Sequence, residues 1–455
     1  MKDSHAHSVS FNVRRQLAIA AGLIIGVVST VSGQTVAERH ALTASDGRDD
    51  DRFGKVLAID GAHLAVGAAF NDQRGPNTGS VYIYDVSAGV ELATIRARDA
   101  RAYDTLGSSV AIDGSFVAIG AMNADSDVAK SGTAYLYDWT SGQLLFKFEP
   151  EQPVPSGQFG NAIAIDDGVV AVGAHYYGLP SSVPGHVYLY DASTGSQTAL
   201  LTPSDGANED QFGWSVDIDD GVVAVGSIRD DDNGNNSGSV YLFDAVSGSQ
   251  IAKLTASDGE AQDRFGWSVA IHNGIVAVGS YLDDDGGVNS GSVYLFDAAT
   301  GNQILKILRP RGRANDWFGF HVSLDGNNLL VSSGKSGASL FDLTSLELTA
   351  QLIGTDSISD DRFGYVSAIS GDIAVVGALF DDNRNGSDAG AVYVFDTRCP
   401  ADLDRDGMVR LSDAMLFIAE YSSASPTADW NNDGIRNFFD LAAYIDDLSA
   451  GCPDH

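Results

Sequence analysis

Two short acidic loops near the end of the chain combine the residue types and the spacing of a calcium site. Each has oxygen-bearing side chains at positions 1, 3, 5 and 12, a main-chain carbonyl at position 7, and a glycine at position 6 where the chain turns sharply. Two copies in register favour calcium binding over a pair of ordinary Asp-rich turns. The expected ligands are Asp402, Asp404, Asp406, Met408 and Asp413 in the first loop, and Asp429, Asn431, Asp433, Ile435 and Asp440 in the second.

A helix is expected after each loop, because apolar residues recur there on one helical face. No helix of comparable length is expected before either loop. A loop followed by a helix, with Asp rather than Glu at position 12, resembles the dockerin module of exported bacterial proteins. The residues that share a face are Ala414, Phe417, Ile418 and Tyr421 in the first helix, and Leu441, Tyr444, Ile445 and Leu448 in the second.

The dockerin resemblance covers residues 399–452 and implies a small EF-hand-like module that needs calcium to fold and binds a cohesin domain. Arg410 stands at position 9 of the first loop, where Asn or Asp is common, so the first site is expected to be the weaker. Positions 10 and 11 serve partner choice in many dockerins, and here they lack the common Ser-Thr pair. The expected partner is therefore cohesin-like or another extracellular protein. The partner-binding residues are Leu411, Ser412, Phe438 and Phe439.

Both ends of the chain indicate an exported protein. Residues 1–33 resemble a signal peptide, because Arg14 and Arg15 precede an apolar stretch that ends in small residues. General secretion is favoured over twin-arginine export, and an uncleaved anchor is the alternative; no later segment is expected to span a membrane. Cys399 and Cys452 flank the last module and are expected to form a disulfide worth about 4 kcal/mol, with two free thiols as the alternative.

The rest of the chain is organised by a repeat. A Phe-Gly pair, once Leu-Gly, recurs seven times, in five steps of 53 residues and a last step of 45. Thirty-two residues after each of the first five marks, an aspartate closes an apolar run. Seven such units indicate a ring or a solenoid. The marks begin at Phe53, Leu106, Phe159, Phe212, Phe265, Phe318 and Phe363, and the aspartates are Asp85, Asp138, Asp191, Asp244 and Asp297.

Each unit is expected to hold four short strands, which makes residues 34–398 a seven-bladed β-propeller; a β-solenoid is the runner-up. In the unit that begins at Phe265 the strand-like runs cover residues 267–271, 275–278, 292–296 and 304–308. The seventh unit lacks its fourth run, and residues 41–47 match such a run, so the N-terminal segment is expected to close the ring. The sixth unit has lost eight residues from a loop and should keep its blade.

Phe53-Gly54 followed by Val66-Gly67-Ala68, with six further copies of the Phe-Gly mark, resembles the FG-GAP repeats of integrin α chains and many bacterial surface proteins. The resemblance covers residues 41–397, although the proline of that motif is absent. FG-GAP blades often carry calcium loops, and acidic loops follow Asp230, Asp283 and Asp381. Calcium and a solvated acidic turn both remain open there. The connections between units, such as 258–263, are expected to cap turns.

Composition limits the function. With 61 acidic and 27 basic residues the formal charge is −34, which disfavours nucleic-acid binding. The residues His63, His175, His186, His272 and His321 lie in or beside expected strands and lack metal-ligand spacing. Lys335 follows a glycine as in a phosphate loop, but the other glycines of that motif are missing. The residues Trp214, Trp267 and Trp317 could stack on sugars, although blade packing is the favoured interpretation.

The sequence therefore predicts an all-β propeller, residues 34–398, followed by a small calcium-binding helical module, residues 399–455. It predicts an exported, monomeric, non-catalytic binding or adhesion protein that ends at the cell surface, in the periplasm or outside the cell. The propeller presents a surface for a glycan or a protein, and the last module docks it. The alternative is an enzyme or accessory protein of extracellular polysaccharide degradation.

Overall fold

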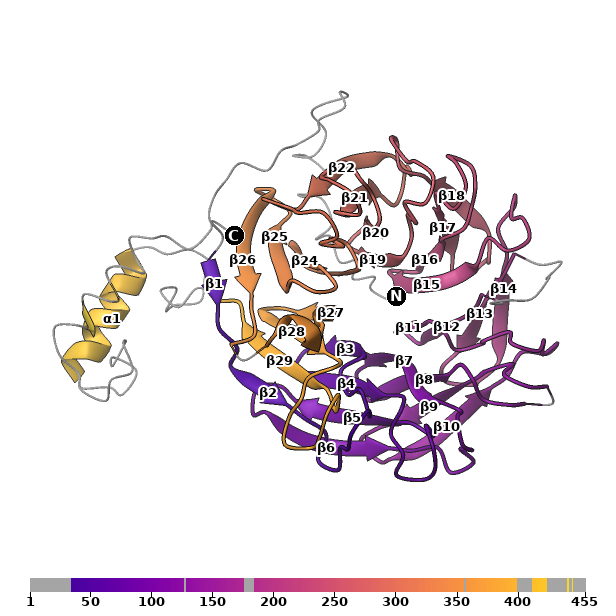
Figure 1. The fold of residues 1–455 in the computed structure, drawn as a ribbon, viewed down its shortest axis with the longest axis horizontal. Helices are drawn as coiled ribbons and strands as arrows, with labels where there is room; N and C mark the ends of the chain where they lie inside the picture. Colours follow the sequence, from indigo (N-terminus) through magenta and orange to yellow (C-terminus); the bar gives the residue numbers. More distant parts are fainter. Residues whose placement is uncertain are drawn as a thin grey trace, which may run out of the picture.

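The structure, a computed structural model, describes residues 34–126, 128–175, 184–355, 357–398, 411–423, 440, 441 and 444. Within residues 34–398 seven antiparallel sheets form a ring, which is a seven-bladed β-propeller (Figure 1). The predicted all-β fold of this part is confirmed. Among the described residues of the ring, the one helical element is the short 3-10 helix η2 (Ser359–Asp361).

Each blade is a four-stranded meander whose first strand lies nearest the axis (Figure 1). The first strands are β3 (Val56–Asp60), β7 (Leu106–Asp113), β11 (Ile163–Asp166), β15 (Phe212–Asp219), β19 (Ser268–His272), β23 (His321–Asp325) and β27 (Phe363–Ser370). The second strands are β4 (His63–Ala68), β8 (Phe116–Ala121), β12 (Val169–Ala174), β16 (Val222–Ser227), β20 (Ile275–Ser280), β24 (Asn328–Ser332) and β28 (Ile373–Ala378).

The third strands end in the aspartates that the repeat marks. They are β5 (Ser80–Asp85), β9 (Thr133–Asp138), β13 (His186–Asp191), β17 (Ser239–Asp244), β21 (Ser292–Asp297), β25 (Ala338–Asp342) and β29 (Ala391–Asp396). The fourth strands of the first six blades are β6 (Val90–Ile95), β10 (Gln143–Phe148), β14 (Gln197–Leu201), β18 (Gln250–Leu254), β22 (Gln303–Leu308) and β26 (Glu347–Leu352).

The N-terminal segment closes the ring, as predicted. Strand β2 (His40–Leu42) pairs antiparallel with β29 and supplies the fourth strand of the seventh blade, with Ala41 opposite Tyr393 (Figure 1). The strand begins one residue earlier than expected. A second strand was not predicted: β1 (Gln34–Val36) pairs in parallel with β26 and adds a fifth strand to the sixth blade. Two neighbouring blades are therefore held by the same short segment.

The Phe-Gly pairs pack where one blade meets the next. Phe265 is almost fully buried and lies edge-on to Tyr294 at 5.4 Å between ring centroids. The carbonyl oxygen of Gly266, the glycine of this pair, would lie 2.2 Å from a Cβ atom on Gly226 in β16 of the preceding blade, so this close approach requires a glycine at position 226. The corresponding contact between Gly377 and Gly54 joins the seventh blade to the first. The repeat motif thus encodes the interface between blades.

The hairpins between third and fourth strands follow the predicted Asp-x-x-x-Gly pattern. Asp297 accepts a hydrogen bond from the backbone N–H of Thr300 at 2.8 Å, and Gly301 has a φ of +70°. In the sixth blade Leu346 replaces the glycine and still adopts a φ of +60°, a conformation that costs a side-chain-bearing residue about 1 kcal/mol. Strands β24 and β25, which the shortened loop joins, remain paired, as do β25 and β26, so this blade survives the deletion, as expected.

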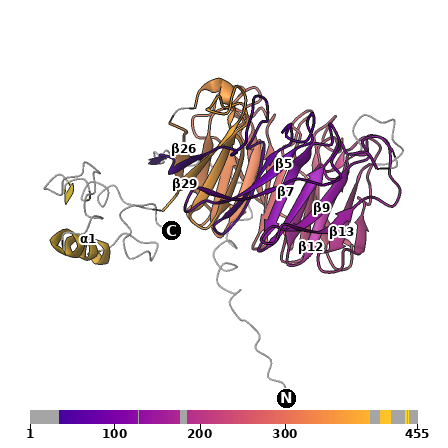
Figure 2. The same cartoon turned by 90° about the horizontal axis from the view of Figure 1, so that it is seen from below.

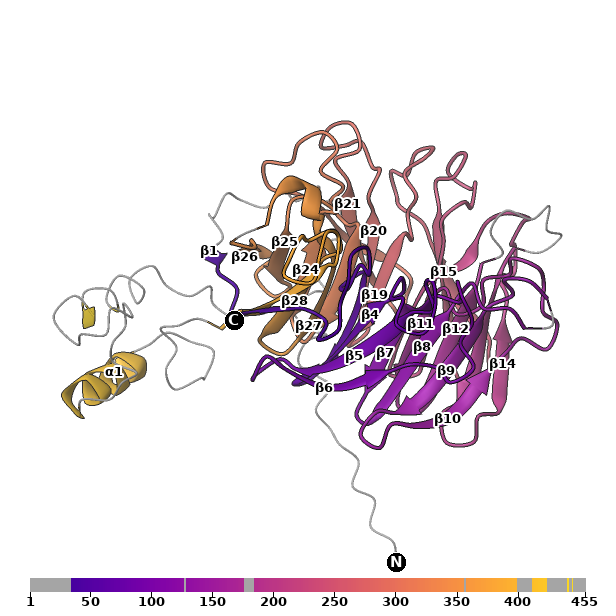
Figure 3. The same ribbon diagram turned by 60° about the horizontal axis from the view of Figure 1, so that its bottom comes forward.

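The first strands run from one end of the propeller axis to the other, and the strands of each blade span the thickness of the ring (Figures 2 and 3). We call the end at which the Phe-Gly pairs lie the FG end. At the opposite end, first-strand aspartates cap the turn of the next blade. Asp60 accepts from the backbone N–H of Gly114 at 2.8 Å, and Asp219 accepts from that of Asn273 at 2.8 Å. These carboxylates serve to link blades.

Candidate binding surface at the FG end of the axis

Four aromatic side chains form a row around the axis at the FG end. Each stands two residues after the Phe or Leu of a Phe-Gly mark, in blades four to seven. The ring centroids are 4.7 Å apart for Trp214 and Trp267, 5.5 Å for Trp267 and Phe320, and 5.0 Å for Phe320 and Tyr365. All four are half-buried. In blades one to three the same position holds Lys55, Ser108 and Asn161.

Two more rings extend this aromatic row. Tyr281 lies 4.5 Å from Trp267, and Trp317 lies 6.1 Å from Phe320 in a stacked arrangement. The sequence favoured blade packing for the tryptophans, and in the structure they pack against rings of neighbouring blades while part of their surface stays exposed. The blade cores are filled by the Phe-Gly phenylalanines, whereas Trp214, Trp267 and Trp317 are half-buried and contact other aromatic rings near the axis.

Cationic side chains surround the aromatic row. Lys335 lies 3.7 Å from the centroid of the Trp317 ring, and the Arg362 guanidinium carbon lies 5.4 Å from it. Six of the cations at this end form no ion pair with a described residue. The six are Arg52, Lys55, Arg229, Arg264, Lys335 and Arg362.

The positive charges of these cations affect the pKa values of neighbouring groups. The pKa of Lys55 is lowered, first by burial and then by the positive charge of Arg52. Burial and, to a smaller extent, the positive charge of Arg229 lower the pKa of His175 to about 4, so this imidazole is neutral at pH 7. Burial raises the pKa of Tyr365, and the nearby charges of Arg362 and Arg52 act in the opposite direction. These cations thus lie close enough to Lys55, His175 and Tyr365 to act on their titration.

Three of the arginines stand at one repeat position, directly before a Phe-Gly mark. All seven residues at this position have a left-handed backbone, with φ between +53° and +59°. Such a φ disfavours side-chain-bearing residues, and glycine would remove the cost. The residues are Arg52, Thr105, Gln158, Gln211, Arg264, Trp317 and Arg362. The fold therefore tolerates Gln and Arg interchangeably at this position.

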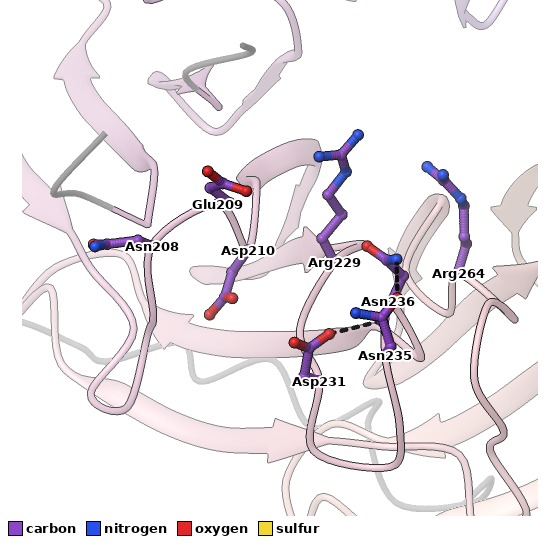
Figure 4. Close-up of a pocket in the computed structure, with 8 residues that line it drawn as sticks. All are labelled: Asn208, Glu209, Asp210, Arg229, Asp231, Asn235, Asn236 and Arg264. Carbon is purple, nitrogen blue, oxygen red and sulfur yellow. Dashed lines mark hydrogen bonds between the residues drawn. The ribbon is translucent and has the colours of Figure 1, made fainter. Parts of the chain in front are cut away.

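A polar cavity of ≈ 310 Å³ lies between the loops of blades four and five. The Arg229 and Arg264 guanidinium groups extend in the same direction there, away from the carboxylates of Asp210 and Asp231 (Figure 4). Their Nε atoms are buried and donate no hydrogen bond within the described chain. The cavity is lined by Asn208, Glu209, Asp210, Arg229, Asp231, Asn235, Asn236 and Arg264.

The acidic loops of blades four and five enclose lysines. The Lys306 ammonium contacts the carboxylates of Asp258, Asp283 and Asp285 at 3.0, 2.9 and 2.6 Å. Burial alone would lower the pKa of Lys306, but its hydrogen bonds to Asp283 and Asp285 raise it above its usual value. In blade four, Lys253 contacts Asp205, Asp230 and Asp232 in the same way. We call these two sets the lysine cages.

The lysine cages limit the interpretation of these loops as solvated acidic turns. Asp230 and Asp283 are buried and paired with lysine, whereas the side chains of Asp232 and Asp285 are 58 % and 57 % exposed, so only part of each loop is solvated. In blade seven the side chain of Asp381 accepts a hydrogen bond from the hydroxyl of Tyr393 at 2.8 Å. Among the described residues no three His, Cys, Asp or Glu side chains are grouped as a metal site.

The aspartate two residues before a Phe-Gly mark caps a turn, as predicted. Asp263 accepts from the backbone N–H of Glu260 at 2.7 Å, and Asp210 accepts from that of Ala207 at 2.6 Å. Burial raises the pKa of Asp51, Asp210 and Asp263 to about 6 in each case. The histidines also lie where the sequence placed them, in or beside strands.

The C-terminal segment is described only in part. Helix α1 (Leu411–Ser423) follows the first predicted calcium loop, as expected, and contains Leu411 and Ser412. Its predicted apolar face is partly wrong, because Ile418 is 56 % exposed whereas Phe417 is buried. The following predicted residues lie outside the described part of the chain: Cys399, Asp402, Asp404, Asp406, Met408, Asp429, Asn431, Asp433, Ile435, Phe438, Phe439 and Cys452.

Sequence reasoning missed the six cations and the continuity of the aromatic row. A signal was present: aligning the units on their Phe-Gly marks places Arg three times directly before the mark and an aromatic residue four times two places after it. Only the closed ring brings these positions from different units together around one axis. Among the described residues no helix is long and apolar enough to cross a bilayer.

The comparison with protein families agrees with this architecture. A family described as FG-GAP repeat matches residues 36–84, 90–137, 196–243, 249–296 and 347–395, which together make up just over half of the chain. Most matches begin at the fourth strand of one blade and end in the third strand of the next, so each spans an interface between blades. No curated protein matches the chain.

Proposed function

This chain belongs to the FG-GAP repeat family, and from that premise we propose that it is a non-catalytic binding protein whose propeller presents the FG end of its axis to a ligand. The observation that carries the proposal is the set of six cations and the aromatic row, gathered at one end of the axis without carboxylate partners among the described residues. Charged side chains that fold stability does not use are commonly used for recognition.

The distribution of these residues supports binding over catalysis. They come from several neighbouring blades, as expected of an extended contact surface. A glycan-degrading propeller, the competing function, would concentrate unlike polar groups in one blade, around the bond that reacts. In a chain with a net charge of −34, cations that form no ion pair with a described residue are the natural contact for an acidic ligand.

We further propose that the C-terminal segment is a calcium-dependent, dockerin-like module that docks the exported propeller to a cohesin-like or other extracellular protein. Asp413 and Asp440, the twelfth residues of the two loops, are both fully buried. Four residues after each of them stands an aromatic ring, and these two rings, Phe417 and Tyr444, stack at 3.9 Å with an interplanar angle of 6°. Equivalent positions of two copies thus meet, which supports a tandem arrangement. Calcium would supply the charge that orders the loops.

The propeller function is tested with the full chain and a panel of immobilised neutral, carboxylated and sulfated polysaccharides and acidic peptides. Retention on the column and release of reducing ends are measured together. We expect retention of the protein without release of reducing ends, and loss of retention when Arg229 and Arg264 are both replaced by Gln. Release of reducing ends would establish the enzyme instead, and unchanged retention of the variant would exclude the FG end as the contact.

Docking is tested by following proteolysis of the full chain after residue 398 with calcium and with a chelator. Protection by calcium is expected because the loops order around the metal. The double variant Phe438→Ala, Phe439→Ala should keep this protection but lose a calcium-dependent partner. Equal proteolysis in both conditions would refute the calcium module.

A further inference from the structure

We propose that the ligand of the FG end is a sugar unit that carries a carboxylate, presented at the end of a glycan chain. This inference rests on the proposed function and names its substrate class. The aromatic row contacts the apolar face of the sugar ring, and the arginines of the polar cavity bind its carboxylate.

The cavity supplies the carboxylate contact. A guanidinium group offers a planar pair of donors that matches a carboxylate, and such pairs are among the strongest hydrogen bonds in proteins. Arg229 and Arg264 extend side by side and form no ion pair with a described residue (Figure 4). Two of the three acids that line the cavity have backbone partners: Asp210 accepts from the N–H of Ala207 and Asp231 from the N–H of Asn236, and both carboxylates point away from the guanidinium groups. Both guanidinium groups therefore keep a charge that an incoming carboxylate can neutralise.

The cavity also supplies contacts for sugar hydroxyls. Asn208, Asn235 and Asn236 line it, and an amide side chain both donates and accepts hydrogen bonds. Asn236 is held in place by its backbone N–H, which donates to Asp231 at 2.7 Å, and by its side chain, which donates to Asn235 at 2.7 Å. Few, well-placed polar groups beside an aromatic surface are typical of small-ligand sites.

The aromatic row explains why the ligand is a ring rather than a simple carboxylate. Trp214 and Trp267 belong to the same two blades as Arg229 and Arg264, and both indoles are half-buried with part of their surface open. Aromatic side chains combine a large apolar face with little conformational freedom, so they bind a rigid ring at low entropic cost. A carboxylate held by the arginines would place the attached ring at this end of the row.

The size and the charge of the surroundings favour a single terminal unit over a long polyanion. The cavity volume of ≈ 310 Å³ is at the lower end of the range for small-molecule sites, about 300–1,000 Å³. Outside the FG end, a chain with a net charge of −34 repels an extended polyanion over roughly the Debye length. An acidic polymer or a nucleic acid would therefore be attracted by the cations near the axis and repelled by the acidic residues on the rest of the surface.

The repeat provides variants that the fold already accepts. Arg264→Gln introduces the residue found at the same position in blades three and four, where Gln158 and Gln211 have φ values of +53° and +59°. Trp267→Asn likewise introduces the residue that blade three has at position 161. Arg398→Gln is the matched control, because Arg398 follows a third strand and lies toward the opposite end of the propeller.

The test is calorimetric titration of the full chain with galacturonic acid, glucose and citrate at low and physiological salt. We expect galacturonic acid to bind more tightly than glucose, which lacks the charge, and than citrate, which lacks the ring. Arg264→Gln should weaken galacturonic acid binding about tenfold or more, because a charged hydrogen bond is lost. Trp267→Asn should weaken it as well, and Arg398→Gln should leave it unchanged. The thermal melt of each variant shows that the propeller is intact.

The outcomes separate this inference from the proposed function. Equal binding of glucose or of citrate, or no binding of galacturonic acid, overturns the carboxylated sugar as ligand. If another member of the polysaccharide and peptide panel is then retained, and the Arg229 and Arg264 variants abolish that retention, the FG end remains the binding surface. If these variants change no retention at all, both proposals fail.

Discussion

Two sets of cations lie in the same two blades at the FG end, and they differ in whether they form ion pairs. Lys253 and Lys306 each sit among three carboxylates. Arg229 and Arg264, in the same two blades, form no ion pair with any described residue. Arg229 even precedes Asp230 in the chain, yet that carboxylate turns to Lys253 at 3.0 Å. Proximity in sequence therefore does not decide which charges pair.

The difference separates charges that hold the fold from charges that are available to a ligand. The lysine cages tie the loop between the second and third strands to the fourth strand and to the connection before the blade. The carboxylates of each cage are already paired with its lysine. The arginines contribute to no such link, so their removal should leave the blades intact. Each of the following measurements tests this contrast, beginning with the largest effect.

Removing a cage lysine should destabilise the propeller strongly. Lys306→Met leaves three carboxylates without their cation, and the side chains of Lys306 and Asp283 are 6 % and 3 % exposed. Breaking a buried pair by removing one partner costs about 3–5 kcal/mol. The control is Lys147→Met, at the same position of blade two, where the lysine and both acidic partners are largely exposed and the cost should stay below about 1 kcal/mol. Urea unfolding of both variants compares the two values, and similar losses would contradict the contrast.

Replacing the same lysine by alanine should make the melting temperature of the propeller respond to divalent cations. Without the ammonium group, Asp258, Asp283 and Asp285 present oxygen ligands around a space that calcium can share with water. We expect millimolar calcium to raise the melting temperature of Lys306→Ala more than that of the parent chain. The parent supplies the baseline for any response of the C-terminal module. An identical calcium response in both proteins would mean that the cage collapses once its lysine is removed.

A change of pH is expected to have a smaller effect on the free energy of unfolding, and two groups of acids contribute to it with opposite signs. Burial raises the pKa of Asp51, Asp210 and Asp263 to about 6, so the folded state binds their protons more tightly than the unfolded state. Lowering the pH from 7 to about 5 should therefore raise the stability. The cage acids Asp205 and Asp258 have lowered pKa values despite burial, because of their hydrogen bonds to lysine. Their contribution is lost as the pH falls below the unfolded value.

Melting temperatures between pH 3 and pH 8 should thus pass through a maximum between about pH 4 and pH 6. Asp263→Asn imitates the protonated acid and should flatten the slope between pH 7 and pH 5. A steady fall of the melting temperature from pH 7 downward would show that burial of these turn-capping carboxylates is not costly.

The architecture of the ring was predictable from spacing alone. Three features of the sequence indicated a closed propeller: the 53-residue step, the aspartates that end the third strands, and the lack of a fourth strand in the seventh unit. The first two are local patterns that recur in most units. Strand β1 was not predictable, since three residues that pair in parallel with β26 carry no distinct pattern. The sixth blade also needed the structure to show that Leu346 can take the place of a glycine.

The binding surface was less predictable, for a geometric reason. Sequence reasoning singled out Trp214, Trp267 and Trp317 but assigned them to blade packing, because their place beside the Phe-Gly mark suggested the interior. The first strand of each blade has one side toward the axis, and that direction is visible only in the closed ring. The lysine cages were hidden in the same way: Lys306 lies 23 residues after Asp283 and 48 after Asp258.

The smallest effect on stability should come from the arginines. Arg264→Gln removes a charge that has no ion-pair partner among the described residues and keeps the left-handed backbone that Gln211 adopts in the preceding blade. Substitutions away from paired or packed groups usually change stability by no more than about 0.5 kcal/mol. We expect unfolding curves that nearly coincide with those of the parent, at low and at high salt. If Arg264→Gln lowers the free energy of unfolding as much as Lys306→Met does, Arg264 stabilises the fold. The charge of Arg264 would then not be available to bind a ligand.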